Sequence, residues 1–271
     1  MRYKGNKAMC GTRLFSTSLC LSISEGLGPT HSRINFNLGQ LDNKNINQPD
    51  IFEDLIEIVI HEITHVLGFS KKFINKWVNT DGSPHVDPII IQEIRGAEVK
   101  LLKTPNVLKY AREYFRCSTL PGMPLENYGS DSSHWESTVI QNEYMIAYQS
   151  NTQLFFSSFT TNLLRDTGFY ATINESMEEK TYYGKGQGCQ YVLGQCRTDK
   201  REHCNEDDQY LQEMSVIGFN GIIRCPENIQ EFCGYKKICP NFCSANGYCN
   251  NNKCYCIKGI NSVDCSSNKS I

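Results

Sequence analysis

The sequence predicts an α+β fold followed by a disulfide-rich C-terminal region, and three features of the chain support this prediction. Residues 33–38 alternate polar and apolar side chains, as a half-buried strand does. Residues 49–67 repeat apolar side chains at the spacing of an amphipathic helix. From Cys189 onward, cysteines and turn-forming residues dominate, so little regular structure is expected there.

The size and charge of the chain limit its class. Its 271 residues suffice for one large or two modest domains with a buried core. The formal net charge is −2 and no Lys/Arg tract occurs, so we expect no nucleic-acid partner. No run of about 18 apolar residues occurs, so we expect no transmembrane segment in this chain. The first residues give at best a weak signal peptide.

The cysteine content indicates an oxidising compartment. The chain has fourteen cysteines, and twelve of them follow residue 116. Structural zinc ribbons need closely spaced thiolate pairs, but no Cys-x-x-Cys pair occurs. We therefore expect disulfides and an extracellular or cell-surface location.

Helix start and stop signals place the other elements. Pro49 suits the first turn of the 49–67 helix, and Gly68 suits a left-handed stop. Short helices are expected over 106–116 and 153–166.

The stretch from residue 80 to residue 135 is expected to be irregular, because glycines and prolines interrupt it repeatedly. The 49–67 helix is rich in β-branched residues and would be a poor helix alone in water. Burial of its apolar face should therefore stabilise it.

The motif His61-Glu62-x-x-His65 lies within this predicted helix. Histidines four apart project from one helix face about 5–6 Å apart, which suits two ligands of one zinc ion. Glu62 can reach a water on that metal without ligating the metal, and can act as its general base. An accidental arrangement is the alternative, but a charged Glu62 in an apolar stretch would be costly without a metal site beside it. The motif predicts zinc-dependent peptide hydrolysis.

A third ligand is needed, and the residues alone leave it open. The compact metzincin pattern would place a histidine at position 71, where this chain has Lys71. The remaining histidines are His31, His85, His134 and His203. Spacing favours His85 and His134 equally. A second alternative is a glutamate on a following helix, for which Glu93 or Glu98 could serve; the helix stop at Gly68 and the later prolines argue against it.

Several motifs together resemble the leishmanolysin family of metzincins. They are His-Glu-x-x-His-x-Leu-Gly-Phe from residue 61, Ser-His-Trp-Glu around residue 134, and Asn-Glu-Tyr-Met-Ile-Ala-Tyr from residue 142. Leu-Leu-Arg-Asp-Thr-Gly-Phe-Tyr from residue 163 and Tyr-Gly-Lys-Gly-Gln-Gly-Cys from residue 183 agree. The similarity runs from about Gly28 to Cys233.

The resemblance implies a metzincin-type zinc peptidase catalytic domain over residues 1–188. It implies His61, His65 and His134 as ligands of one catalytic Zn²⁺ and Glu62 as the base. It also implies that Met145 forms the floor beneath the zinc, although an ordinary core methionine is the commoner role for this residue type. The third ligand and the methionine turn would fall at about 130–150.

Members of the family usually carry a larger N-terminal subdomain than the 48 or so residues that precede the zinc helix here. We therefore expect the N-terminal part of the catalytic domain to be truncated. In metzincins an extended substrate pairs with an edge strand above the zinc, and the candidate for that strand is 33–38.

The end of the chain resembles an EGF-like module over residues 239–265, preceded by a cysteine-rich region at 189–238 and followed by a tail at 266–271. The spacing Cys239-x3-Cys243-x5-Cys249-x4-Cys254-x-Cys256-x8-Cys265 carries this resemblance. It implies the pairs Cys239–Cys249, Cys243–Cys254 and Cys256–Cys265. The sequence leaves open the pairing of the other eight cysteines, which are Cys10, Cys20, Cys117, Cys189, Cys196, Cys204, Cys225 and Cys233.

The predicted function is that of a zinc metalloendopeptidase whose partners are protein or peptide substrates. A non-catalytic adhesion or interaction protein on a degenerate metzincin scaffold is the alternative. The EGF-like module could then bind a cell-surface or matrix partner.

Overall fold

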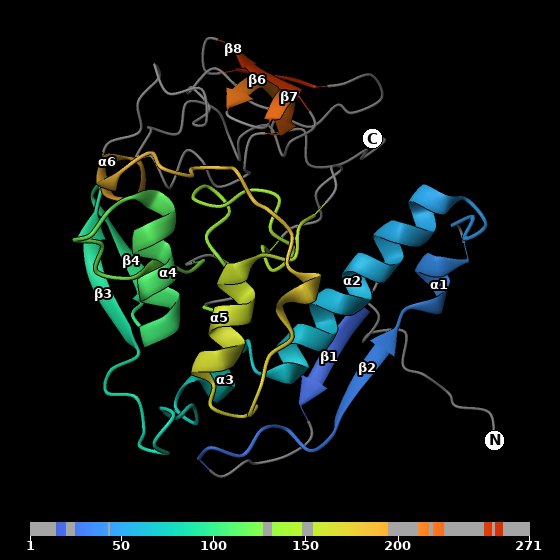
Figure 1. Ribbon diagram of the computed structural model, residues 1–271. Helices are drawn as coiled ribbons and strands as arrows, with labels where there is room; N and C mark the ends of the chain where they lie inside the picture. The colour runs from blue at the N-terminus through green and yellow to red at the C-terminus, as the bar shows by residue number, and fades with distance from the viewer. Residues whose placement is uncertain are drawn as a thin grey trace, which may run out of the picture.

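A computed structural model of the chain describes residues 15–19, 25–42, 44–126, 132–147, 154–194, 211–216, 219–224, 247–250 and 253–256. Helix α2 (Pro49–Leu67) runs between two parts of the molecule (Figure 1). On one side lies a ribbon of β1 (Phe15–Leu19) and β2 (Ser32–Phe36), with the short α1 (Leu38–Leu41) after it. On the other side lies most of the buried core.

The bounds of α2 agree with the sequence prediction. Pro49 stands at the first helical position, where its missing N–H costs nothing. Gly68 ends the helix with φ at 142°, and its N–H donates to the carbonyl of His65. Strand β2 confirms the strand predicted at 33–38, although it begins one residue earlier and ends two earlier.

The prediction of an irregular chain from 80 to 135 was wrong. Strands β3 (Ile89–Ile94) and β4 (Ala97–Leu102) form an antiparallel hairpin, and β5 (Met123–Pro124) pairs with β4. The two turn residues, Arg95 and Gly96, have φ of 57° and 75°, as a type I′ turn requires. Apart from Pro124, the glycines and prolines of this stretch lie outside the strands, so they do not prevent strand formation.

Two helices pack together beside this sheet. They are α4 (Pro105–Phe115), close to its predicted range, and α5 (Ser158–Asp166), which begins five residues later than predicted. Shorter helices are α3 (Lys71–Ile74), η2 (Glu175–Met177) and α6 (Cys189–Leu193). The core between them is rich in aromatic rings; Phe115 and Phe159 are fully buried, with centroids 5.8 Å apart.

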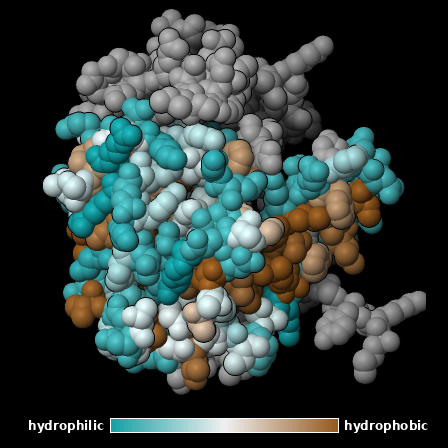
Figure 2. Space-filling model, viewed as in Figure 1, coloured by the Kyte–Doolittle hydropathy of each residue, from teal (hydrophilic) through white to brown (hydrophobic). Residues whose placement is uncertain are grey.

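The apolar face of α2 is only partly buried. Leu55 is 9% exposed, but Phe52, Ile56, Ile60 and Ile63 are 38–51% exposed. They form the brown band over α2 in Figure 2. Burial therefore stabilises this helix less than its sequence led us to expect, and its fit to the core rests on its C-terminal half.

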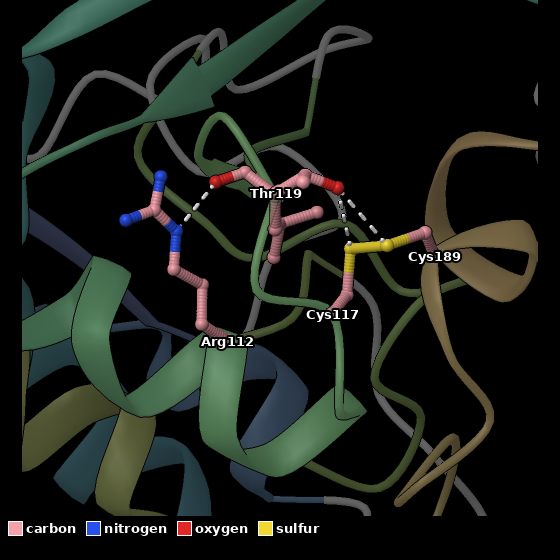
Figure 3. Close-up of a disulfide and its surroundings, with 5 residues drawn as sticks. Arg112, Cys117, Thr119 and Cys189 are labelled. Atoms are coloured by element: carbon pink, nitrogen blue, oxygen red, sulfur yellow. Dashed lines mark hydrogen bonds between the residues drawn. A yellow bond between two sulfur atoms is a disulfide. The ribbon is translucent and has the colours of Figure 1, made fainter.

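A disulfide joins Cys117, just after α4, to Cys189 at the start of α6 (Figure 3). The hydroxyl of Thr119 lies 3.4 Å from the sulfur of Cys189. The side chain of Arg112 donates to the carbonyl of Leu120, which holds the same turn. This bridge resolves one of the pairings that the sequence left open.

The C-terminal region contains two described hairpins. They are β6 (Leu211–Val216) with β7 (Phe219–Arg224), and β8 (Gly247–Asn250) with β9 (Lys253–Cys256). The three disulfides predicted for the EGF-like module lie outside the described residues and side chains, and so do the cysteines at 10, 20, 196, 204, 225 and 233. Within the described part, no helix is long and apolar enough to cross a bilayer.

Candidate metal centre

Three histidine rings meet at the C-terminal half of α2. His61 and His65 lie one turn apart on the helix, with their Nε2 atoms 3.1 Å apart. The Nε2 of His134 lies 3.0 Å from that of His61 and 3.1 Å from that of His65. Among the described residues, these three are the group of histidines, cysteines and carboxylates placed to hold a metal ion.

A short antiparallel pairing positions His134. The amide of Glu136 donates to the carbonyl of Pro124, and the amide of Glu126 donates to the carbonyl of His134. Leu125 and Trp135 form the bridge between these two bonds. The segment that carries His134 thus continues from β5 and the three-stranded sheet.

Packing connects the two parts of the centre. The ring of Trp135 is fully buried and lies 4.8 Å, centroid to centroid, from the ring of Phe69, which follows α2. The indole N–H of Trp135 donates to the hydroxyl of Thr160 on α5. A buried aromatic pair and a satisfied N–H therefore fix the residue next to His134.

The Nδ1 atom of each histidine faces an oxygen acceptor. Nδ1 of His61 lies 2.7 Å from the carbonyl oxygen of Tyr144, and Nδ1 of His65 lies 2.7 Å from that of Phe69. Nδ1 of His134 lies 3.3 Å from a carboxylate oxygen of Glu126. Each Nδ1 therefore carries the proton, and each Nε2 keeps its lone pair.

This arrangement fits a cation at the meeting point. Three lone pairs that converge at 3.0–3.1 Å repel one another unless a positive ion lies between them. Nitrogens bound to a tetrahedral zinc ion at about 2.0–2.1 Å are roughly 3.3 Å apart, close to the spacing seen here. Three imidazoles with oriented Nδ1 protons are also the ligand set that leaves a fourth position open in catalytic zinc sites.

Burial favours the neutral form of His61 and of His65. It lowers the pKa of His61 well below 6.5, and the charges of His134 and His65 act in the same direction. Burial also lowers the pKa of His65, while its bond to Phe69 and the charge of Glu62 partly oppose this shift. Neutral imidazole is the form that binds metal.

Glu62 lies on α2 between the two histidines and is half-buried. Its carboxylate is not among the atoms grouped as ligands, yet its charge reaches His65. This placement suits a carboxylate that works beside a metal ion and does not bind it.

Met145 is fully buried, and its carbonyl accepts the amide of Trp135 at 3.0 Å. Its own amide donates to the carboxylate of Glu143 at 2.5 Å, and the hydroxyls of Ser157 and Thr160 donate to the same carboxylate. Glu143 thus ties the turn around Met145 to the start of α5. Burial raises its pKa to about 7, although the donated hydrogen bonds oppose that shift.

The other candidate ligands lie elsewhere. His85 contacts the carbonyl of Asp166 through Nε2 at 2.7 Å, and His31 contacts the hydroxyl of Thr30. Glu93 and Glu98 face each other on β3 and β4, so neither occupies a helix as the glutamate-ligand alternative requires. His203 lies outside the described residues.

Sequence reasoning missed Glu126 and Glu143. A single glutamate in a loop carries no periodic signal, and only the pairing of distant segments brings these two into the centre. The Pro-Leu-Glu run at 124–126, a short β-like stretch before the third histidine, was the available hint.

The sequence of the chain is similar to those of known peptidases. The family model described as leishmanolysin matches residues 16–269. A "Leishmanolysin-like peptidase" of Drosophila pseudoobscura pseudoobscura is 29% identical over an alignment of 184 residues, gaps included, which covers 55% of this chain and 27% of that protein. A "Leishmanolysin homolog" of Crithidia fasciculata is 29% identical over an alignment of 168 residues, which covers 57% of this chain and 23% of that protein.

A "Ciliated left-right organizer metallopeptidase" of Danio rerio is 31% identical over an alignment of 142 residues, which covers 50% of this chain and 22% of that protein. The aligned part thus spans about a quarter of the length of these curated relatives. The family model, in contrast, covers nearly all of the present sequence. The chain belongs to the leishmanolysin family of peptidases.

Proposed function

We propose that this chain is a zinc-dependent metalloendopeptidase that hydrolyses peptide bonds of protein substrates. The convergence of the Nε2 atoms of His61, His65 and His134 is the observation that carries the proposal. Membership of a peptidase family supports the same reaction.

His61, His65 and His134 would hold the ion, and their Nδ1 contacts would keep the three rings in place. A bound Zn²⁺ supplies a water of lowered pKa and polarises a substrate carbonyl. Glu62 would accept the proton of the attacking water and return it to the leaving amine. Its half-buried position on α2, one residue after His61, supports this role.

Met145 would form the apolar floor of the site. Its full burial supports this role, and so do the hydrogen bonds of its carbonyl with the amide of Trp135 and of its amide with the carboxylate of Glu143. Strand β2 would pair with an extended substrate. In the part of the chain that the structure describes, β2 belongs to a two-stranded sheet with β1.

The test is hydrolysis of a casein substrate by the purified protein, together with its zinc content. We expect hydrolysis that a chelator abolishes and that Glu62→Gln reduces by orders of magnitude while zinc stays bound. His134→Ala should lose zinc, whereas His85→Ala should keep it. Unchanged hydrolysis in Glu62→Gln would refute the enzymatic role, and zinc binding without any hydrolysis would favour a non-catalytic interaction protein.

We further propose an extracellular or cell-surface location. The Cys117–Cys189 disulfide and the cysteine-rich C-terminal region support it, because such bridges persist in oxidising compartments. The EGF-like module at 239–265 stays a prediction, with a cell-surface or matrix protein as its partner. Mass spectrometry of unreduced peptides would test its three predicted pairs.

A further inference from the structure

We propose that Glu126 is a positioning residue for the metal centre, and that its carboxylate orients His134 for zinc through Nδ1. The inference rests on the proposed zinc site and names a residue outside its ligands. The observation behind it is the 3.3 Å contact between the carboxylate of Glu126 and Nδ1 of His134, on the side of the ring opposite the converging Nε2 atoms.

The register of a short backbone pairing brings the side chains of Glu126 and His134 together. Leu125 pairs with Trp135, so Glu126 lies directly opposite His134 in the short antiparallel pairing. Side chains of directly opposite residues point to the same face, with their Cβ atoms about 4.5–5.5 Å apart. A glutamate reaches an imidazole at that distance without strain. The backbone bond from the amide of Glu126 to the carbonyl of His134, at 3.0 Å, holds the pair in register.

Burial makes the contact stronger than a surface ion pair. The side chains of His134 and Glu126 are 10% and 14% exposed. Exposed ion pairs contribute little, because water screens them and the side chains lose freedom. A shielded carboxylate that accepts the N–H of a metal-binding imidazole makes that imidazole a better donor to the metal.

The three histidines differ in the kind of acceptor that faces Nδ1. The acceptors opposite His61 and His65 are the backbone carbonyls of Tyr144 and Phe69. Both histidines also lie on one rigid helix. His134 comes from a separate segment, and the acceptor opposite its Nδ1 is a charged side chain. Besides Glu62, Glu126 therefore places a second carboxylate close to the three imidazoles, and its charge would help to offset that of a divalent ion.

The test is the zinc affinity of the full chain, measured by competition with a chromophoric chelator. Glu126→Gln keeps an acceptor oxygen but loses the charge, and Glu126→Ala loses both. We expect zinc to bind about 10-fold more weakly in Glu126→Gln and up to about 100-fold more weakly in Glu126→Ala. The matched control is Glu113→Gln, an exposed glutamate on α4, which should bind zinc as the wild type does.

Two further readouts separate positioning from a loss of fold. The metal-free variants should unfold at nearly the wild-type temperature, and the visible spectrum of the Co²⁺-substituted protein should shift in Glu126→Gln but not in Glu113→Gln. Equal zinc affinity in wild type and Glu126→Ala, or an equal loss in Glu113→Gln, would overturn the inference. A wild-type protein that binds no zinc would instead refute the proposed function.

Discussion

The hydroxyl of Thr64 lies 2.5 Å from the hydroxyl of Tyr144, in the interior between α2 and the turn that contains Met145. Both residues are at least 96% buried. The carbonyl of the same tyrosine accepts the ring N–H of His61, so one residue connects the helix to the turn at two points. Burial raises the pKa of the Tyr144 hydroxyl well above 10, which keeps it neutral and able to donate.

This pair predicts an asymmetric response to substitution. Thr64→Val leaves the Tyr144 hydroxyl buried without this partner, which should lower the free energy of unfolding by about 1–3 kcal/mol. Tyr144→Phe should cost only about 1 kcal/mol, because Thr64 keeps its bond to the carbonyl of Ile60. Chemical denaturation of both variants and of the double variant checks this. Strictly additive losses would show that the two hydroxyls do not interact.

Zinc retention should extend to mildly acidic pH. Burial lowers the pKa of His61 and of His65 from 6.5, so protons should compete weakly with zinc for these two proposed ligands. Because both pKa values are lowered in the folded state, the stability they confer is present above 6.5 and is lost as the pH falls through the folded values. Zinc content after dialysis over a series of pH values should decline only well below 6.5. Release centred at or above that value would contradict the prediction.

Glu143 should give the opposite pH dependence. Its pKa rises from 4.5 to about 7 on folding, so its stabilising effect is present below 4.5 and is lost as the pH rises through about 7. Glu143→Gln cannot titrate and also sets an amide N–H against that of Met145. We expect the variant to be less stable, with the largest deficit to wild type on the acidic side of this window.

The metal-free forms of both proteins should be compared, so that zinc release does not enter the measurement. The histidine contributions then cancel between wild type and Glu143→Gln. A difference in melting temperature that stays constant from pH 4.5 to 7 would show that Glu143 does not titrate as described.

The disulfide should contribute substantially to stability. It closes a loop over a sequence separation of 72 residues. Replacing Cys117 and Cys189 together by alanine should lower the free energy of unfolding by about 2–5 kcal/mol, chiefly because the unfolded chain gains freedom. Thermal or urea unfolding measures the loss. A change below about 0.5 kcal/mol, within the range of ordinary surface substitutions, would mean that the bridge constrains little.

The sequence predicted those elements whose signals are local. Pro49, the helical spacing of apolar residues and Gly68 predicted both ends of α2 correctly. The same helix places His61 and His65 on one face. The hairpin of β3 and β4 was missed, although the β-branched run at 89–91 and the Arg95-Gly96 turn were visible in the sequence.

What could not be predicted depends on contacts between distant segments. Spacing alone left His85 and His134 equal, and the structure distinguishes them because the pairing of residues 124–126 with 134–136 brings His134 to the helix. The exposure of Ile56 and Ile60 could not be predicted either, because a helical pattern shows which face is apolar but not whether another surface covers it.

The Cys117–Cys189 bridge also determines what a protease could release from this molecule. His134 and Met145 both lie inside the loop that it closes, whereas His61 and His65 lie outside. A single backbone cut anywhere between residues 118 and 188 would therefore leave both fragments covalently attached. Such a nicked chain would migrate as one species in a gel without reductant and separate into two pieces with it.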